Sequence, residues 1–201
     1  MKSAKIIAIA NQKGGVGKTT TSINLAASLG KLGKKTLIID LDPQGNATTG
    51  LGVNKGNINY SVYDVLNGSC EAKKAVRKTG FTNLSIIPAT INLAGIDIEL
   101  MEKGYQNVEF KKNEQLRNAL ATIMDNYDYM IIDCPPSLGL LTTNALVASD
   151  SVIIPVQCEF FALEGITQLL NTIIMTQTRL NPNLKIEGVL LTLSLIHISE
   201  P

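Results

Sequence analysis

The sequence has few of the residues that bind metals or form disulfides. It contains three cysteines and one histidine among 201 residues. Cys70, Cys134 and Cys158 stand far apart and form no Cys-x-x-Cys pair, and the histidine is His197. A zinc site or a disulfide framework is therefore not expected, and this cysteine usage is typical of a protein in a reducing cytosol.

Excess charge of one sign and long apolar segments are also missing. The formal net charge is +1, so bulk charge does not indicate nucleic acid, an anionic membrane or an acidic substrate as a partner. No segment reaches the ~18 apolar residues needed to span a bilayer. The apolar stretch near the N-terminus is too short for a signal peptide. With 45% hydrophobic residues, the chain is expected to form one globular domain with a sizeable core.

Short apolar runs recur along the chain and predict buried strands. They are mostly rich in Ile and Val and do not alternate, which is typical of strands covered on both faces of a parallel sheet. The runs are Ile6–Ala10, Thr36–Ile39, Leu84–Ile87, Tyr129–Ile132, Val152–Val156 and Ile186–Leu191. Helical spacing between them predicts helices over Thr19–Leu32, Glu114–Met124 and Leu163–Leu180. This alternation predicts an α/β fold with a mostly parallel sheet flanked by helices.

A glycine-rich loop joins the first predicted strand to the first predicted helix. It reads NQKGGVGKTT from Asn11 to Thr20. In this context backbone N–H groups turn inward around an anion and the helix N-terminus adds partial positive charge, as in a phosphate-binding loop. Lys18 is expected to reach the β- and γ-phosphates, and the Thr19 hydroxyl to bind Mg²⁺. The predicted nucleotide-binding residues are Lys13, Gly14, Gly15, Val16, Gly17, Lys18, Thr19 and Thr20.

The first half of this loop departs from the standard GxxxxGK[ST] pattern. Gln12 stands where the first glycine is expected, and Lys13 follows it. A lysine at the lip of the loop is placed to reach the phosphates of a nucleotide on a second subunit. There it would neutralise charge that develops in the transition state, as a trans-acting arginine finger does. Lys13 is therefore predicted to be catalytic across a dimer interface; a solvated loop lysine is the alternative.

Carboxylates follow two of the predicted strands. Ligands of such sheets bind beyond the carboxyl ends of the strands. Asp40 and Asp42 follow the strand Thr36–Ile39 and are expected to point the same way. One would position the attacking water and the other would join the Mg²⁺ shell, unless they are simple turn residues. Asp133 follows the strand Tyr129–Ile132, as a second nucleotide-site carboxylate (Walker B) does. Mg²⁺ prefers one or two carboxylates with phosphate oxygens and water. The predicted metal ligands are Thr19, Asp42 and Asp133, and Asp42 is also a predicted catalytic residue.

Three segments together resemble the ParA/Soj family of partitioning ATPases, which belongs to the deviant Walker A class. They read KGGVGKTT, DLDPQGNATTGLG and YMIIDCPPSLGLLTTNAL, and the resemblance covers about residues 4–193. It implies a P-loop NTPase fold and a cytoplasmic, nucleoid-associated ATPase that forms a sandwich homodimer around two molecules of ATP with Mg²⁺. It also implies that Lys13 is the signature lysine acting across the interface, that Asp42 is linked to hydrolysis and that Asp133 holds the Walker B position.

The resemblance further implies partners. The ATP dimer would bind DNA without sequence preference, and a ParB-type centromere-binding protein would stimulate slow hydrolysis in plasmid or chromosome segregation, with no membrane involved. A MinD-type membrane-positioning ATPase is an alternative that needs a C-terminal amphipathic helix. An iron–sulfur reductase or metabolic P-loop enzyme is another, and a cluster shared by two subunits would need two suitable cysteines per chain. A DNA-coating filament or adaptor that uses ATP only as a switch is a third.

The C-terminal part departs from the family. Relatives continue with further α/β elements beyond the strand Ile186–Leu191, whereas this chain reads LSLIHISEP over Leu193–Pro201. We expect residues 1–193 to form a P-loop ATPase domain that lacks its C-terminal part, and residues 194–201 to be a non-native tail. An uninterrupted frame through LSLIHISEP in an independent isolate would contradict this expectation.

Overall fold

The protein is built on one seven-stranded sheet with the order β3-β4-β2-β5-β1-β6-β7. The computed structural model describes residues 3–158 and 162–192, except for the side chains of 162–165. Neighbouring strands are parallel apart from β3 and β4, which are antiparallel. This arrangement confirms the predicted mostly parallel sheet. The strands are β1 (Lys5–Ile9), β2 (Thr36–Asp40), β3 (Arg77–Lys78), β4 (Leu84–Ile87), β5 (Tyr129–Asp133), β6 (Ser151–Gln157) and β7 (Lys185–Thr192).

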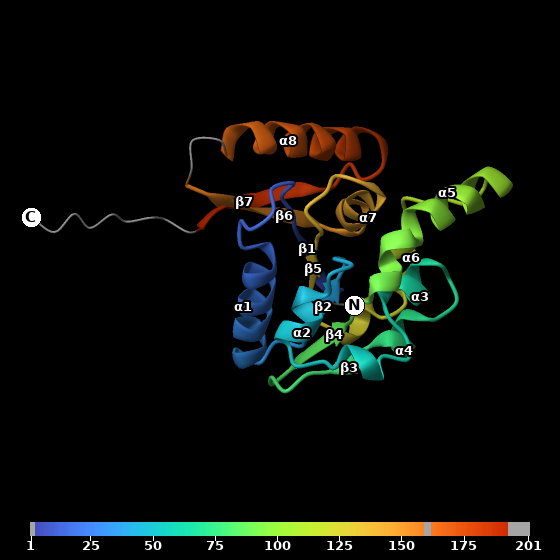
Figure 1. Ribbon diagram of the computed structural model, residues 1–201. Coiled ribbons are helices and arrows are strands. Elements are labelled where there is room, and N and C mark those ends of the chain that lie inside the picture. Colours follow the sequence, from blue (N-terminus) through green and yellow to red (C-terminus); the bar gives the residue numbers. More distant parts are fainter. Residues whose placement is uncertain (1–2, 159–161, 193–201) are drawn as a thin grey trace, which may run out of the picture.

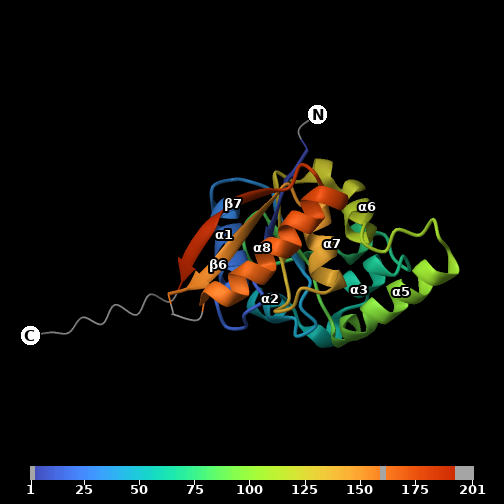
Figure 2. The same cartoon turned by 90° about the horizontal axis from the view of Figure 1, so that it is seen from above.

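Helices cover both faces of the sheet (Figures 1 and 2). On one face lie α1 (Lys18–Lys31) and the short α2 (Asn46–Gly50). The remaining helices contribute buried residues to the core on the other face: α3 (Val62–Leu66), α4 (Ala72–Ala75), α5 (Ile96–Gln106), α6 (Gln115–Ala121), α7 (Leu140–Ala148) and α8 (Ala162–Arg179). The described residues also contain 3₁₀ turns at Lys55–Asn57, Ile91–Gly95 and Met124–Asn126. No helix among the described residues is long and apolar enough to cross a bilayer.

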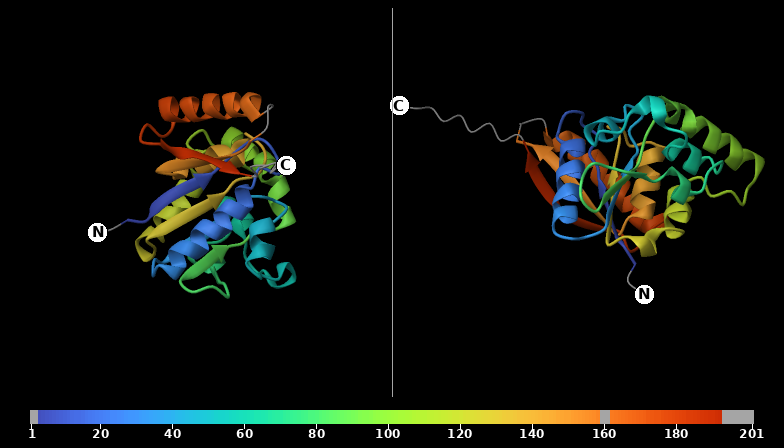
Figure 3. Two further views of the ribbon diagram at one scale, coloured as in Figure 1. Left: turned by 90° about the vertical axis from the view of Figure 1, so that its left-hand side faces the viewer. Right: turned by 90° about the horizontal axis from the view of Figure 1, so that it is seen from below.

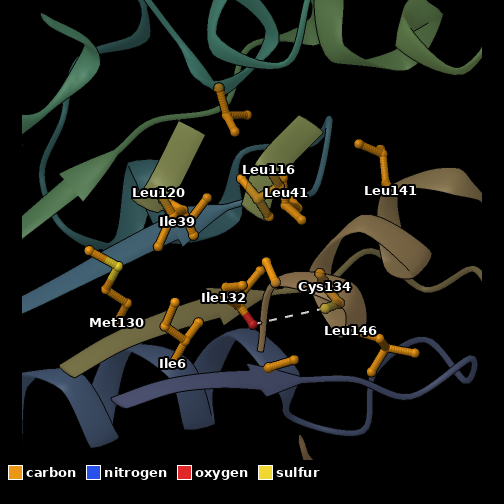
Figure 4. Packing of buried hydrophobic residues seen from close by; sticks show 14 of the residues in the cluster. Ile6, Ile39, Leu41, Leu116, Leu120, Met130, Ile132, Cys134, Leu141 and Leu146 are labelled. Atoms are coloured by element: carbon orange, nitrogen blue, oxygen red, sulfur yellow. Dashed lines mark hydrogen bonds between the residues drawn. The ribbon is translucent and has the colours of Figure 1, made fainter. Parts of the chain in front are cut away.

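Successive residues of the central strands enter two separate cores. Ile7 and Ile9 of β1 pack on the α1 side, and Ile6 and Ala8 pack on the other side. Figure 4 shows the second core, where Ile6 and Ile132 lie between the strands and the neighbouring helices. Because both faces of these strands are buried, their sequences are apolar without alternation, as predicted from the sequence.

The six predicted strands are all present, with bounds that differ by at most one residue. The three predicted helices correspond to α1, α6 and α8. The segment Gly45–Ser61, for which no helix or strand was predicted, contains α2 and a 3₁₀ turn. The expectation for residues 194–201 falls outside the described part of the chain.

The carboxyl ends of β1, β2 and β5 meet at one edge of the sheet (Figure 3). The register pairs Asp40 of β2 with Asp133 of β5 and Ile9 of β1 with Asp133. The glycine loop follows β1, and Asp42 lies two residues beyond Asp40. The three chain segments singled out in the sequence analysis are therefore brought together at this edge.

Candidate functional site

The glycine loop between β1 and α1 ends in a left-handed turn. Gly17 has φ 86° and ψ 20°, a conformation that residues with a Cβ rarely adopt. The following helix α1 has no side-chain cap at Gly17 and no acidic residue in its first turn. Its first N–H groups and its positive end therefore suit an anion bound at this loop.

Lys18 is buried at the first position of α1, with 6% of its surface exposed. Its Nζ donates a hydrogen bond to the carbonyl oxygen of Lys13, 2.9 Å away on the far side of the loop. Burial lowers the pKa of Lys18, and the carboxylates of Asp133 and Asp42 act in the opposite direction. The ammonium group is thus held inside the loop, where a phosphate oxygen can replace the carbonyl as its acceptor.

Asp133 lies beneath the loop at the end of β5. Its Oδ1 accepts a hydrogen bond of 2.9 Å from Ser22 Oγ, and the nearby Thr19 side chain favours the charged form of this carboxylate. Its Oδ2 is buried and has no hydrogen-bond partner among the described residues. Burial, followed by the charge of Asp40, raises the pKa of Asp133 to about 7.

These oxygens fit a hard divalent cation. A buried carboxylate oxygen without a partner and a neighbouring threonine hydroxyl are the ligand types that Mg²⁺ prefers. Within the described residues, no group of three or more His, Cys, Asp or Glu side chains is arranged to hold a metal. A cation at Asp133 would therefore depend on phosphate oxygens and water for the rest of its shell.

Asp40 and Asp42 have different surroundings, although both are buried. Asp40 Oδ2 accepts hydrogen bonds from Thr48 N and Thr48 Oγ1 at 2.8 and 2.7 Å, and its Oδ1 accepts from Asp42 N at 3.1 Å. Burial raises the pKa of Asp40 to about 6. Asp42 lies beyond the end of β2, and its Oδ1 accepts from Gln44 N at 2.9 Å. Both Asp40 oxygens are thus engaged in holding the loop that carries Asp42.

The structure places the predicted site residues around one loop. Lys18 is close enough to Asp133 and Asp42 for both charges to affect its pKa. Lys13 is half-buried at the lip, and its N–H donates to Asn11 Oδ1 at 3.0 Å. The other predicted loop residues differ in exposure: Gly14, Gly15 and Thr20 are exposed, Val16 is buried, and Gly17 and Thr19 are half-buried. The roles assigned to these residues remain predictions.

Four polar residues of the site were not singled out from the sequence. Ser22 is one helical turn after Lys18, so its spacing offers a signal that it faces the same strands. Asn11 directly precedes the loop and donates from Nδ2 to the Pro155 carbonyl at 2.7 Å. Thr48 lies in the quoted segment DLDPQGNATTGLG, but nothing there marks it as the partner of Asp40, and the partner of Thr192, Val16, is 176 residues away.

A loop of this geometry, with a buried lysine and carboxylates at the carboxyl edge of a parallel sheet, defines the P-loop class of α/β proteins. A family described as "AAA domain" matches residues 4–186. The sporulation initiation inhibitor protein Soj of Bacillus subtilis is 57% identical over 94% of this chain and 72% of its own length. The chromosome partitioning protein ParA of Caulobacter vibrioides is 49% identical over 94% of this chain and 69% of its own length. The chain belongs to the ParA/Soj family of partitioning ATPases.

A solved structure agrees on the fold but carries a different name. It is described as cobyrinic acid a,c-diamide synthase from Mycobacterium smegmatis with bound ADP and magnesium. The match has a TM-score of 0.87 and 42% identity, and it covers 94% of this chain and 74% of that one. The fold and the P-loop class are therefore shared. The partitioning proteins are more similar to this chain, at 57% and 49% identity.

Proposed function

We propose that the chain binds Mg·ATP in the glycine loop and hydrolyses it slowly as a partitioning ATPase. The observation that carries this proposal is the arrangement of Lys18 and Asp133 beneath the loop. Lys18 Nζ is held inside the loop by a backbone carbonyl, and Asp133 keeps one buried oxygen without a partner among the described residues. A bound nucleotide would give the Lys18 ammonium negatively charged phosphate oxygens as acceptors, and a bound cation would give the buried Asp133 oxygen a partner.

Each predicted residue has a place in this proposal. Lys18 would exchange the Lys13 carbonyl for phosphate oxygens, while the amides of the loop and of α1 hold the same phosphates. Mg²⁺, when bound, would offset the phosphate charge, and Thr19, Asp42 and Asp133 are the residues that would hold it. Asp42 would also orient the attacking water, because its loop is fixed by Asp40 beside the site.

We extend the proposal to assembly and partners. Lys13, at the lip of the loop, would reach the phosphates of a second subunit in an ATP-dependent homodimer. That dimer would bind DNA without sequence preference through Lys and Arg contacts to phosphates, and so associate with the nucleoid. A ParB-type centromere-binding protein would stimulate hydrolysis. The names of the Bacillus and Caulobacter relatives favour this cycle over a MinD-type role.

The Lys18→Ala variant tests the nucleotide site. We expect it to weaken binding of a non-hydrolysable ATP analogue with Mg²⁺ about 100-fold or more, because several charge-assisted hydrogen bonds are lost together. Lys34→Ala, which removes an exposed lysine after α1, is the matched control and should bind like the parent. Isothermal calorimetry measures both. Unchanged binding by Lys18→Ala would contradict the proposed site.

The name of the Mycobacterium smegmatis structure motivates a second test. Phosphate release is measured with DNA and a ParB-type protein, and separately with cobyrinic acid and an ammonia donor. A partitioning ATPase is stimulated only in the first assay. Stimulation in the second assay, with amide formation, would replace the proposal by an amide-forming activity.

A further inference from the structure

The end of β7 touches the glycine loop, although the two segments are far apart in the sequence. Thr192 Oγ1 donates a hydrogen bond of 2.7 Å to the carbonyl oxygen of Val16, 176 residues away. The methyl carbon of Thr192 lies 3.6 Å from the position that a Cβ on Gly17 would occupy. The final residue of β7 therefore packs on the Val16–Gly17 peptide group, which lies just before α1.

This contact fixes the orientation of one peptide group. The Val16–Gly17 peptide is trans, since the described residues contain no cis peptide bonds. In a trans peptide the C=O and the following N–H lie in one plane and point in opposite directions. When Thr192 holds the Val16 carbonyl toward β7, the Gly17 N–H must point away from β7. Gly17 adopts a left-handed conformation and has no side chain that could restrain this orientation.

The start of the loop is anchored in a comparable way. Asn11 Nδ2 donates to the Pro155 carbonyl of β6 at 2.7 Å, and Asn11 Oδ1 accepts from Lys13 N at 3.0 Å. The ends of β6 and β7 thus hold the two ends of the loop. A loop with three glycines would otherwise lose considerable backbone entropy when it closes around an anion.

We propose that Thr192 is a positioning residue for nucleotide binding: its hydroxyl holds the Val16 carbonyl so that the Gly17 amide faces the phosphates. This inference rests on the proposed function, because it concerns the same loop. Thr192 acts through the Val16–Gly17 peptide group and does not itself contact the nucleotide. Removing its hydroxyl should weaken phosphate binding and leave the fold without nucleotide unchanged.

The test compares three variants of the whole chain. Thr192→Val keeps the shape and loses the hydroxyl, and Thr192→Ser keeps the hydroxyl. Thr178→Val is the matched control, because it removes a threonine-to-carbonyl hydrogen bond from the exposed side of α8. Calorimetry measures Mg·ADP binding, and thermal unfolding without nucleotide monitors the fold. We expect Thr192→Val to bind about 5- to 10-fold more weakly than the parent, which corresponds to the loss of about one hydrogen bond.

The other variants show whether the hydroxyl of Thr192 or only its shape matters. Thr192→Ser and Thr178→Val should bind within twofold of the parent, and the unfolding temperatures should stay within about 5 °C of the parent, as expected for the loss of one hydrogen bond. Unchanged binding by Thr192→Val, or equal losses in the Val and Ser variants, would overturn the inference while leaving the proposed function in place. A parent protein that binds no Mg·ADP would instead overturn the proposed function. Should Thr192→Val fail to fold, Thr192→Ala, which adds no apolar bulk beyond Cβ, takes its place under the same criteria.

Discussion

Asp40 and Asp42 are two residues apart, and their contacts give them different tasks. Three hydrogen bonds from Thr48 and from the Asp42 backbone engage both oxygens of Asp40. Thr48 Oγ1 also accepts from Ala89 N at 2.9 Å, which ties this group to the segment after β4. Asp40 therefore acts on the site by holding the backbone of the Asp42 loop, and Thr48 is its main partner.

The Thr48→Val variant tests this arrangement. It removes the hydroxyl that serves both Asp40 and the Ala89 amide, so we expect a loss of about 1–3 kcal/mol in the free energy of unfolding. We also expect ATP turnover to fall about tenfold, while analogue binding changes less than about threefold, because the Asp42 loop loses its fixed position. Thr48→Ser should restore turnover. Steady-state kinetics and urea unfolding measure these effects, and full turnover in the Val variant would refute the role given to Thr48.

Whether a site residue could be predicted depended on how far apart in the sequence it and its partners lie. The loop, Lys18 and the strand-end aspartates could be found because their motifs are contiguous. Their partners could not, because Ser22 bonds to a residue 111 positions away and Asn11 to one 144 positions away. The spacing of Ser22 indicates which face of α1 it occupies, but not which carboxylate it meets after folding.

At the scale of elements, α1 packs closely on the connection between β3 and β4. A Cβ added at Gly30 would stand 2.4 Å from the carbonyl oxygen of Thr82. Asn83 Nδ2 also donates to the Gly30 carbonyl at 3.2 Å, and Asn83 O accepts from Thr36 N at 2.9 Å. Gly30 thus allows the last turn of α1 to contact the turn that precedes β4.

Two glycine-to-alanine variants in helices distinguish the steric cost of this contact from the gain in helix propensity. Gly30→Ala should lower the free energy of unfolding by about 1–3 kcal/mol, because the backbone at Thr82 must move. Gly104→Ala in α5 meets only Lys112 Cδ at 3.7 Å and should be neutral or stabilising by up to about 1 kcal/mol. Urea unfolding compares them. If both variants gained stability, the close packing of α1 at Gly30 would be disproved.

Elements could be predicted where burial leaves a recognisable pattern. The central strands are apolar throughout because two layers of helices cover them. The helix α7 was missed because eight of its nine residues are buried, so it has no polar face to set a period. The short helix α2 lies in a segment rich in glycine and polar residues, and its formation depends on contacts with α1 and β2.

At the scale of the whole molecule, the site places two carboxylates in the core. Burial raises the pKa of Asp40 to about 6 and that of Asp133 to about 7, both above the usual value of 3.8. The native state therefore binds protons more tightly than the unfolded state between about pH 4 and pH 7. Without nucleotide, the contribution of these groups to stability is largest below pH 4 and is lost as the pH rises through 7.

Asp133→Asn measures this contribution. The amide oxygen still accepts from Ser22, and the charge is absent at every pH. We expect the free energy of unfolding of the variant, relative to the parent, to rise between pH 4 and 7 and to level off above that range. Since one pKa unit corresponds to about 1.4 kcal/mol, the gain should be on the order of 2–4 kcal/mol. Asp125→Asn, at an exposed position, is the control. A constant difference across this pH range in urea unfolding would contradict the buried charge.

The proposed cycle requires that Mg·ATP assembles two chains, with Lys13 reaching across the interface. The mass of the Asp42→Ala variant, measured by light scattering with and without Mg·ATP, shows whether this dimer forms. Loss of the aspartate should block hydrolysis and trap any ATP dimer, so we predict that the mass doubles with Mg·ATP. The double variant Lys13→Ala, Asp42→Ala should remain a monomer that still binds ATP. A mass that stays monomeric for Asp42→Ala, or that doubles without Lys13, would contradict the proposed ATP-dependent dimer.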